Sequence, residues 1–230
     1  MKIKSELIDL GEKFAGYLSV KEYGKAKELL INGIEHTRGA LNNPSFPDEE
    51  KTELYYWAIL FRGLIDYVCL VELVSKEQWA LKNENVERAW ELICDAKKRF
   101  GFCTGTIEGP SMEKARSFLA SMEIFFLENF GSGYYSSPEI LIKTTECSIC
   151  GLDLIICEHI PGRIYAGKRC RSIAKDLELK AVSIVHNPHD PRCRIWPWHV
   201  KGADQIESCI IYAGAFDDFI MNDNWKADIE

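Results

Sequence analysis

Hydrophobic residues recur every three or four positions through much of the first 130 residues, which is the spacing of one face of an α-helix. The stretches Val86 to Ala96 and Ala115 to Phe126 follow this period most closely. Ser111 is the expected N-cap of the second helix, and the glycines at 131 and 133 predict its end. The apolar stretch Leu54 to Val74 predicts a helix buried inside the protein.

The pattern changes after Tyr134, where short apolar runs rich in branched and aromatic residues lie between turn residues. Such runs are typical of short β-strands. The sequence therefore predicts an α+β protein, with an N-terminal helical bundle domain over residues 1–133 and a small α+β domain over 134–230. The expected strands lie in the runs ILIKTT, LIIC, RIYAG, KAVSIV, CRIW and SCIIYAG.

Composition narrows the class of protein. The 230 residues are 47% hydrophobic and 27% charged, as in ordinary globular proteins, and the net charge is -7. That charge argues against general binding to nucleic acid or to anionic membranes. Three charges (Arg62, Asp66 and Glu72) interrupt the most apolar stretch, and two acids interrupt the first ten residues, so we expect neither a membrane span nor a secretory signal. These features predict a cytoplasmic protein.

Five of the nine cysteines crowd into residues 147–193. Because reducing compartments keep thiols free, this clustering favours a metal site over disulfides or free buried thiols. Cys147 and Cys150 are separated by two residues and followed by a glycine, as in a zinc knuckle. Cys157 and His159 would point to the same side of a strand.

Together these four residues form a C-x2-C-x6-C-x-H set, and thiolates with an imidazole select zinc. Four ligands close a zinc site, so a structural, zinc finger-like role is expected. Cys170 lies eleven residues beyond His159 and could replace Cys157 or His159. The metalloprotease HExxH pattern is absent, and the order of the zinc deaminase motif is reversed.

The string CSICG, then C-x-H-I-x-G, Y-x-G and Asn-Pro-x-Asp-Pro-Arg-Cys-Arg-Ile, resembles an uncharacterised family of bacterial or phage zinc-binding proteins. That resemblance spans about 147–195 and implies a metal site without an activity. The run from the knuckle through Glu158 and His159 also resembles the front half of an HNH endonuclease. This second resemblance implies His159 as the general base and Glu158 as a ligand of the catalytic metal, although the second C-x2-C knuckle is missing.

The stretch 186–194 holds two prolines and several polar side chains. His186, His189, Asp190 and Cys193 could ligate a second ion, but a rigid turn whose Asp bonds its own backbone is the favoured interpretation. Basic residues outnumber acidic ones from 158 to 194, and Trp196 and Trp198 follow. They could bind nucleic acid through phosphate contacts and stacking, or the tryptophans could be buried against the helices.

Three functions follow from these patterns. The first is a protein without enzymatic activity, in which zinc stabilises a C-terminal module that recognises a macromolecular partner. That partner would be a protein, or nucleic acid bound through the basic segment 163–194. The second is an HNH-like nuclease that uses Glu158 and His159. The third is a scaffolding homo-oligomer subunit that associates through its helices.

Overall fold

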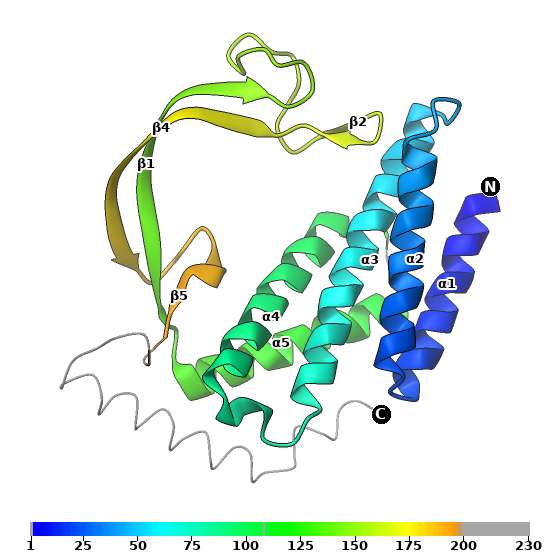
Figure 1. Cartoon of the computed structure of the whole chain (residues 1–230), viewed down its shortest axis with the longest axis vertical. Coiled ribbons are helices and arrows are strands. Elements are labelled where there is room, and N and C mark those ends of the chain that lie inside the picture. Colours follow the sequence, from blue (N-terminus) through cyan, green and yellow to red (C-terminus); the bar gives the residue numbers. More distant parts are fainter. Residues whose placement is uncertain (1, 108, 197, 199–230) are drawn as a thin grey trace. The chain divides into compact units, whose positions relative to one another are not determined.

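A computed structural model describes residues 2–107, 109–196 and 198 of the chain. Five α-helices precede the strands in it, so the α+β class and the N-terminal helical bundle are confirmed (Figure 1). Contacts divide the chain into two compact units that each combine separate segments. Unit 1 holds 1–65, 98–109 and 138–183, and unit 2 holds 66–97, 110–137 and 184–230. The division of the chain into domains 1–133 and 134–230 stays a prediction.

The helices occupy the ranges that the hydrophobic period indicates. They are α1 (Lys2–Ser19), α2 (Tyr23–Leu41), α3 (Asp48–Val74), α4 (Asn83–Cys103) and α5 (Pro110–Phe130), with a short 3-10 helix at Trp79–Leu81. The helix α3 contains the whole apolar stretch predicted to be buried. The helix α5 starts at Pro110, one residue before the expected cap, in a position that proline favours. It ends before Gly131, whose φ of 66° is the left-handed conformation expected there.

In unit 1, α1 packs against α2, and α2 approaches α3 closely. A Cβ at Gly33 would lie 3.0 Å from the ring of Phe61, so a small residue is needed at this crossing. Phe102, near the end of α4, stacks on Tyr56 of α3 with 5.3 Å between ring centroids. These contacts form an apolar core for the unit.

In unit 2, aromatic residues dominate the core. Phe126 is fully buried, and its ring contacts those of Trp90 and Trp196 at 5.2 and 6.1 Å. Trp196 therefore packs against α5, and this confirms that it is buried against the helices. Trp198 contacts the ring of Phe130 at 6.2 Å and donates to the carboxylate of Glu87 at 2.6 Å.

The strands form two small sheets. The larger one has the order β4-β1-β5, with β1 at Tyr134–Cys147, β4 at Ser172–Val185 and β5 at Arg194–Ile195. The strands β1 and β4 run in opposite directions (Figure 1). The strand β1 pairs antiparallel with β5, so that Tyr135 lies opposite Arg194.

The smaller sheet is the hairpin of β2 (Ile164–Tyr165) and β3 (Lys168–Arg169). Its two turn residues, Ala166 and Gly167, both have positive φ, as the tightest hairpin turns require. A Cβ at Gly167 would lie 2.7 Å from Cδ2 of Leu41, so the turn touches α2 within unit 1.

Most of the predicted strands are present in the described residues, and one is wrong. The runs ILIKTT, RIYAG, KAVSIV and CRIW lie wholly or partly in strands. The run LIIC, at 154–157, forms a turn instead. The run SCIIYAG lies outside the described residues. No helix in the described part of the chain has both the length and the apolar character needed to cross a membrane.

Candidate metal centre

A tight turn carries the first two candidate ligands. Strand β1 ends at Cys147, and Gly151 follows Cys150 with a φ of 74°, which glycine adopts without strain. The N–H of Gly151 donates to the carbonyl of Cys147 at 2.8 Å, and the N–H of Cys147 donates to the carbonyl of Leu152 at 2.8 Å. The predicted knuckle is therefore present as a closed turn.

The loop after the knuckle returns the chain to it. Asp153 pairs with Glu146 in an isolated bridge, and its carboxylate accepts a hydrogen bond from the N–H of Ile155 at 2.9 Å. The N–H of Ile156 donates to the carbonyl of Asp153 at 3.1 Å. These bonds replace the strand expected for 154–157, because an aspartate that bonds its own backbone favours a turn.

Cys157 and His159 reach the knuckle by this return. The ligand atoms of Cys147, Cys150, Cys157 and His159 all lie within 4.8 Å of one another. The sulfurs of Cys150 and Cys157 are 3.4 Å apart, and Nδ1 of His159 lies 3.4 Å from Sγ of Cys157. The four predicted ligands thus meet in one cluster, although no strand underlies the last two.

Cys170, left open by the spacing, lies beside the same cluster. It directly follows β3, and its sulfur is 3.7 Å from that of Cys147. Both cysteines are almost completely buried, whereas Cys150 is exposed. The cluster therefore offers five donor groups.

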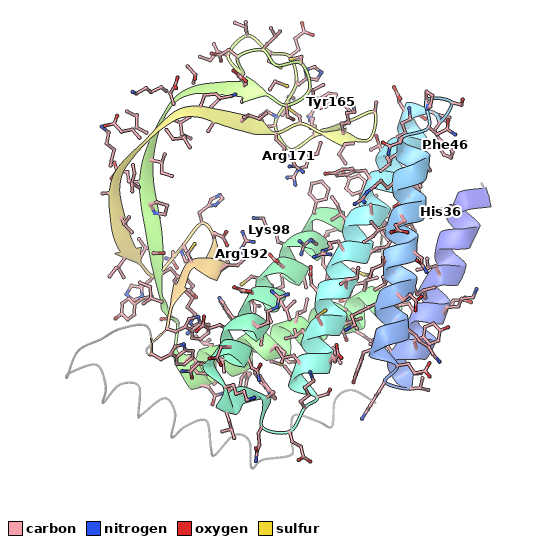
Figure 2. The ribbon with its side chains drawn as sticks, viewed as in Figure 1. His36, Phe46, Lys98, Tyr165, Arg171 and Arg192 are labelled. Atoms are coloured by element: carbon pink, nitrogen blue, oxygen red, sulfur yellow. The ribbon has the colours of Figure 1, made fainter. Side chains whose placement is uncertain are left out.

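Hydrogen bonds to Ser148 join the knuckle to the segment before β4. The N–H of Ser148 donates to the carbonyl of Arg171 at 3.0 Å, and the hydroxyl of Ser148 accepts from the N–H of Arg171 at 2.8 Å. Tyr165 lies on β2, and its ring meets that of His159 edge-on with 4.8 Å between centroids. Figure 2 labels Tyr165 and Arg171, which border the cluster. The sequence pattern did not single out these contacts, since no local spacing relates the residues.

The metal-free cluster holds its charge unevenly. Burial opposes ionisation of Cys147, but hydrogen bonds from the backbone N–H groups of Cys150 and Ile149 outweigh it and lower its pKa to about 6. Burial, together with the neighbouring Cys150 and Cys147, raises the pKa of Cys157 to about 11. Burial and the Cys147 side chain also raise the pKa of Cys170. A bound divalent cation would displace the protons that Cys157 or Cys170 carries when it becomes a ligand.

The donor set fits a thiophilic metal ion. Three thiols and an imidazole match the ligand preference of zinc, and a set of four leaves no position open for water. The residues thus suit a structural ion better than a catalytic one. Glu158, the metal ligand implied by the HNH resemblance, is exposed and is not part of the cluster.

The stretch 186–194 forms a turn without a second cluster. The carboxylate of Asp190 accepts from the N–H of Arg192 at 3.1 Å, which confirms the expected turn. The same carboxylate pairs with the guanidinium of Arg192, which also reaches Asp95 at 3.1 Å. Nδ1 of His186 lies 3.3 Å from the carbonyl of Gly133. In the described ranges, only the cluster at 147–159 brings together three or more potential metal ligands.

Several side chains that could bind nucleic acid have partners within their own unit. Arg194 is buried and donates to the carbonyl of Phe130 at 2.8 Å, at the end of α5. The guanidinium of Arg169 lies 4.4 Å from the ring centroid of Phe102. Because Trp196 is buried as well, these residues do not form an exposed stacking surface.

No protein-family model matches the chain, and it matches neither a curated protein nor a solved structure. The resemblances to an uncharacterised family of bacterial or phage zinc-binding proteins and to HNH endonucleases therefore remain predictions from the motif. The cluster itself is the observation from which a function can be argued.

Proposed function

We propose that this chain is a zinc-binding protein without enzymatic activity, in which the metal stabilises a β-ribbon that recognises another protein. The support for zinc is the meeting of Cys147, Cys150, Cys157 and His159 within 4.8 Å. Such a set is closed, and closed sites stabilise folds rather than catalyse reactions.

The position of the cluster explains what the metal stabilises. Cys147 is the last residue of β1, and Ser148 is hydrogen-bonded to Arg171, directly before β4. We define the ribbon as the paired strands β1 and β4. A two-stranded ribbon is marginally stable alone, and an ion at its end fixes the two chains that leave it.

The ribbon exposes an apolar surface, which supports binding of a partner there. Consecutive residues of a strand point to opposite faces, so the exposure of Ile140, Leu141 and Ile142 leaves both faces open. Further aliphatic side chains are exposed on β4, namely Ile173, Leu177, Leu179 and Val182. Exposed apolar side chains that gather on one structural element in this way are typical of a protein–protein interface.

The proposed occupant of this surface is a second copy of the chain. The outer edge of β4 has no strand partner in the described residues, and such an edge accepts another strand. The charges on the ribbon are mixed, with acids and lysines on both strands, so two ribbons can complement each other. They are Glu139, Lys143, Glu146, Lys175, Asp176, Glu178 and Lys180.

Zinc content is tested by native mass spectrometry of the full chain, where we expect one zinc ion per chain. A chain that binds no zinc would contradict the metal part of the proposal. Magnesium- or manganese-dependent cleavage of DNA or RNA that is lost in His159→Ala, with the fold intact, would contradict the non-enzymatic part.

Self-association is tested by sedimentation velocity of the zinc-loaded chain. We expect a dimer, and we expect Leu179→Asp to shift it to monomer because a charge would enter the interface. Leu127→Asp is the matched control: Leu127 lies on α5 and is 56% exposed, against 62% for Leu179. A wild-type monomer, or equal loss of dimer in both variants, would contradict the ribbon as the interface.

A further inference from the structure

The proposed zinc site has more donors than a tetrahedral ion accepts. Cys147, Cys150 and Cys157 supply three sulfurs, His159 lies within 4.8 Å of all three, and the sulfur of Cys170 lies 3.7 Å from that of Cys147. Zinc in a structural site takes four ligands. The inference below concerns this fourth position and rests on the zinc proposed above.

The distances between sulfurs favour a site of four cysteines. Bonds of about 2.3 Å in a tetrahedral site place two sulfurs about 3.8 Å apart. The sulfurs of Cys147 and Cys170 are separated by 3.7 Å. Those of Cys150 and Cys157 are separated by 3.4 Å. Both separations match an edge of such a tetrahedron, and the sulfurs of Cys147, Cys150 and Cys157 lie within 4.8 Å of one another.

The backbone gives His159 a different role. Sγ of Cys147 accepts a hydrogen bond from the N–H of Ile149 at 3.3 Å. Sγ of Cys157 accepts one from the N–H of His159 at 3.2 Å. In each case the donor is the second residue after the cysteine. His159 thus stands where Ile149 stands in the first knuckle, and Ile149 contributes an N–H and no ligand.

The backbone around Cys170 holds its sulfur in place. The N–H of Cys170 donates to the carbonyl of Arg163 at 2.8 Å, and the carbonyl of Cys170 accepts from the N–H of Gly162 at 2.9 Å. On its other side, Arg171 is bonded to Ser148. These bonds fix the backbone at Cys170, and its thiol is buried beside that of Cys147.

We propose that Cys170 is the fourth zinc ligand, which completes a four-cysteine site with Cys147, Cys150 and Cys157. His159 is then a positioning residue outside the coordination shell. Its Nδ1 faces the sulfur of Cys157 at 3.4 Å, and its ring rests against Tyr165.

X-ray absorption at the zinc edge of the wild-type chain tests the assignment without any variant. We expect four sulfurs at about 2.3 Å and no imidazole. Three sulfurs with one nitrogen at about 2.0 Å and the scattering pattern of an imidazole ring would overturn it. A chain that holds no zinc fails the proposed function instead, so the two failures are distinct.

Variants loaded with Co²⁺ provide a second test, because the thiolate-to-cobalt charge-transfer band grows with the number of sulfur ligands. We expect Cys170→Ser to lose about a quarter of the band intensity and His159→Gln to keep all of it. Cys193→Ser is the control, since Cys193 is an exposed cysteine outside the cluster. An unchanged band in Cys170→Ser would overturn the proposal, because a site of three cysteines and His159 keeps all its sulfur ligands in that variant. If Cys170→Ser does not fold, the absorption spectrum of the wild type still decides.

Discussion

Strand β1 is stabilised by different chemistry at its two ends. At its start, in unit 2, Tyr135 is buried and pairs with Arg194, whose guanidinium lies 5.0 Å from the ring of Trp90 and 4.8 Å from that of Trp196. At its other end, in unit 1, Cys147 enters a cluster of thiols. The aliphatic residues nearby point outward, and Ile155 is 90% exposed.

The two ends of β1 differ in how much apolar surface is buried around them. The start of β1 rests on aromatic rings that bury large apolar areas, which stabilises a fold without help. In residues 147–171, all of which the structure describes, only the two cysteines Cys147 and Cys170 are buried. A segment with so little apolar burial cannot offset its conformational entropy, and the zinc ion proposed for the cluster would supply the missing stabilisation.

Removal of zinc is therefore expected to have the largest effect and to act on one region only. A structural zinc contributes on the order of 10 kcal/mol to a small site at neutral pH. After chelation, amide hydrogens of 147–171 should exchange at rates near those of an unfolded chain. Amides of α5 should keep their protection. Hydrogen exchange followed by mass spectrometry measures both.

The Cys193→Ser variant serves as the control for this experiment, since its response to the chelator should match that of the wild type. Equal loss of protection in α5 and in 147–171 would show that the two regions do not differ as argued. Unchanged protection in 147–171 would show that no metal stabilises that segment.

Substitution of Trp196 by alanine should destabilise unit 2, where β1 begins. Trp196 contacts Phe126 and Phe130 and is almost completely buried, so Trp196→Ala should lower the free energy of unfolding by about 3–5 kcal/mol. Zinc content should stay at the wild-type value. Denaturant unfolding and metal analysis of the same sample test both statements.

Tyr134→Ala is the matched control, because Tyr134 is the exposed neighbour of Tyr135 at the start of the same strand. Its loss should be below about 1 kcal/mol. Loss of zinc in Trp196→Ala would contradict the statement that the two ends of β1 are stabilised separately.

Sequence reasoning succeeded where the signal is local. The helices follow a period that each segment carries by itself, and the two residues between Cys147 and Cys150 fix a knuckle whatever surrounds it. The strand predicted for 154–157 is wrong. Its apolar residues indicate a strand, but the carboxylate of Asp153 accepts a hydrogen bond from the N–H of Ile155 and the chain turns there. The exposure of Leu177 and Leu179 was also out of reach, since composition does not reveal which apolar residues stay uncovered.

The place of Cys170 shows the same limit. Eleven residues separate it from His159, and that spacing alone fits a ligand or a bystander. Its approach to Cys147 depends on the β2–β3 hairpin and on the bonds between Ser148 and Arg171. Only the folded arrangement of these segments brings the two sulfurs together.

The pH dependence of zinc affinity tests how many thiols of the cluster are protonated before the metal binds. Cys157, with a pKa of about 11, is protonated in the metal-free protein between pH 7 and 9, and zinc must displace that proton. Affinity should therefore rise with pH, at least about tenfold per pH unit, or about 1.4 kcal/mol. If Cys170 also binds the metal, the rise with pH is steeper, because its raised pKa adds a further proton that zinc must displace. Cys147, with a pKa of about 6, adds a proton only below that range.

Competition with a chelator of known affinity, corrected for the chelator's own protonation, measures this slope. His159→Gln provides the comparison, because that variant keeps every thiol of the cluster. An affinity that does not change between pH 7 and 9 would mean that the thiols are already ionised without the metal.

The smallest expected effect concerns the turn of the β2–β3 hairpin. Gly167 has a φ of 74°, and an added Cβ would lie 2.7 Å from Leu41 and 3.0 Å from the Cβ of Lys51. Gly105 has a φ of 80° with no atom within 4 Å of its added Cβ, so it is a control with the same backbone conformation and open space. Each alanine variant should lose about 1 kcal/mol because the left-handed conformation disfavours a side chain. Gly167→Ala should lose about 1 kcal/mol more, since Leu41 and Lys51 must move. Denaturant midpoints of the two zinc-loaded variants give the difference directly. Equal losses would mean that the turn does not touch α2, and that the metal alone holds the hairpin in place.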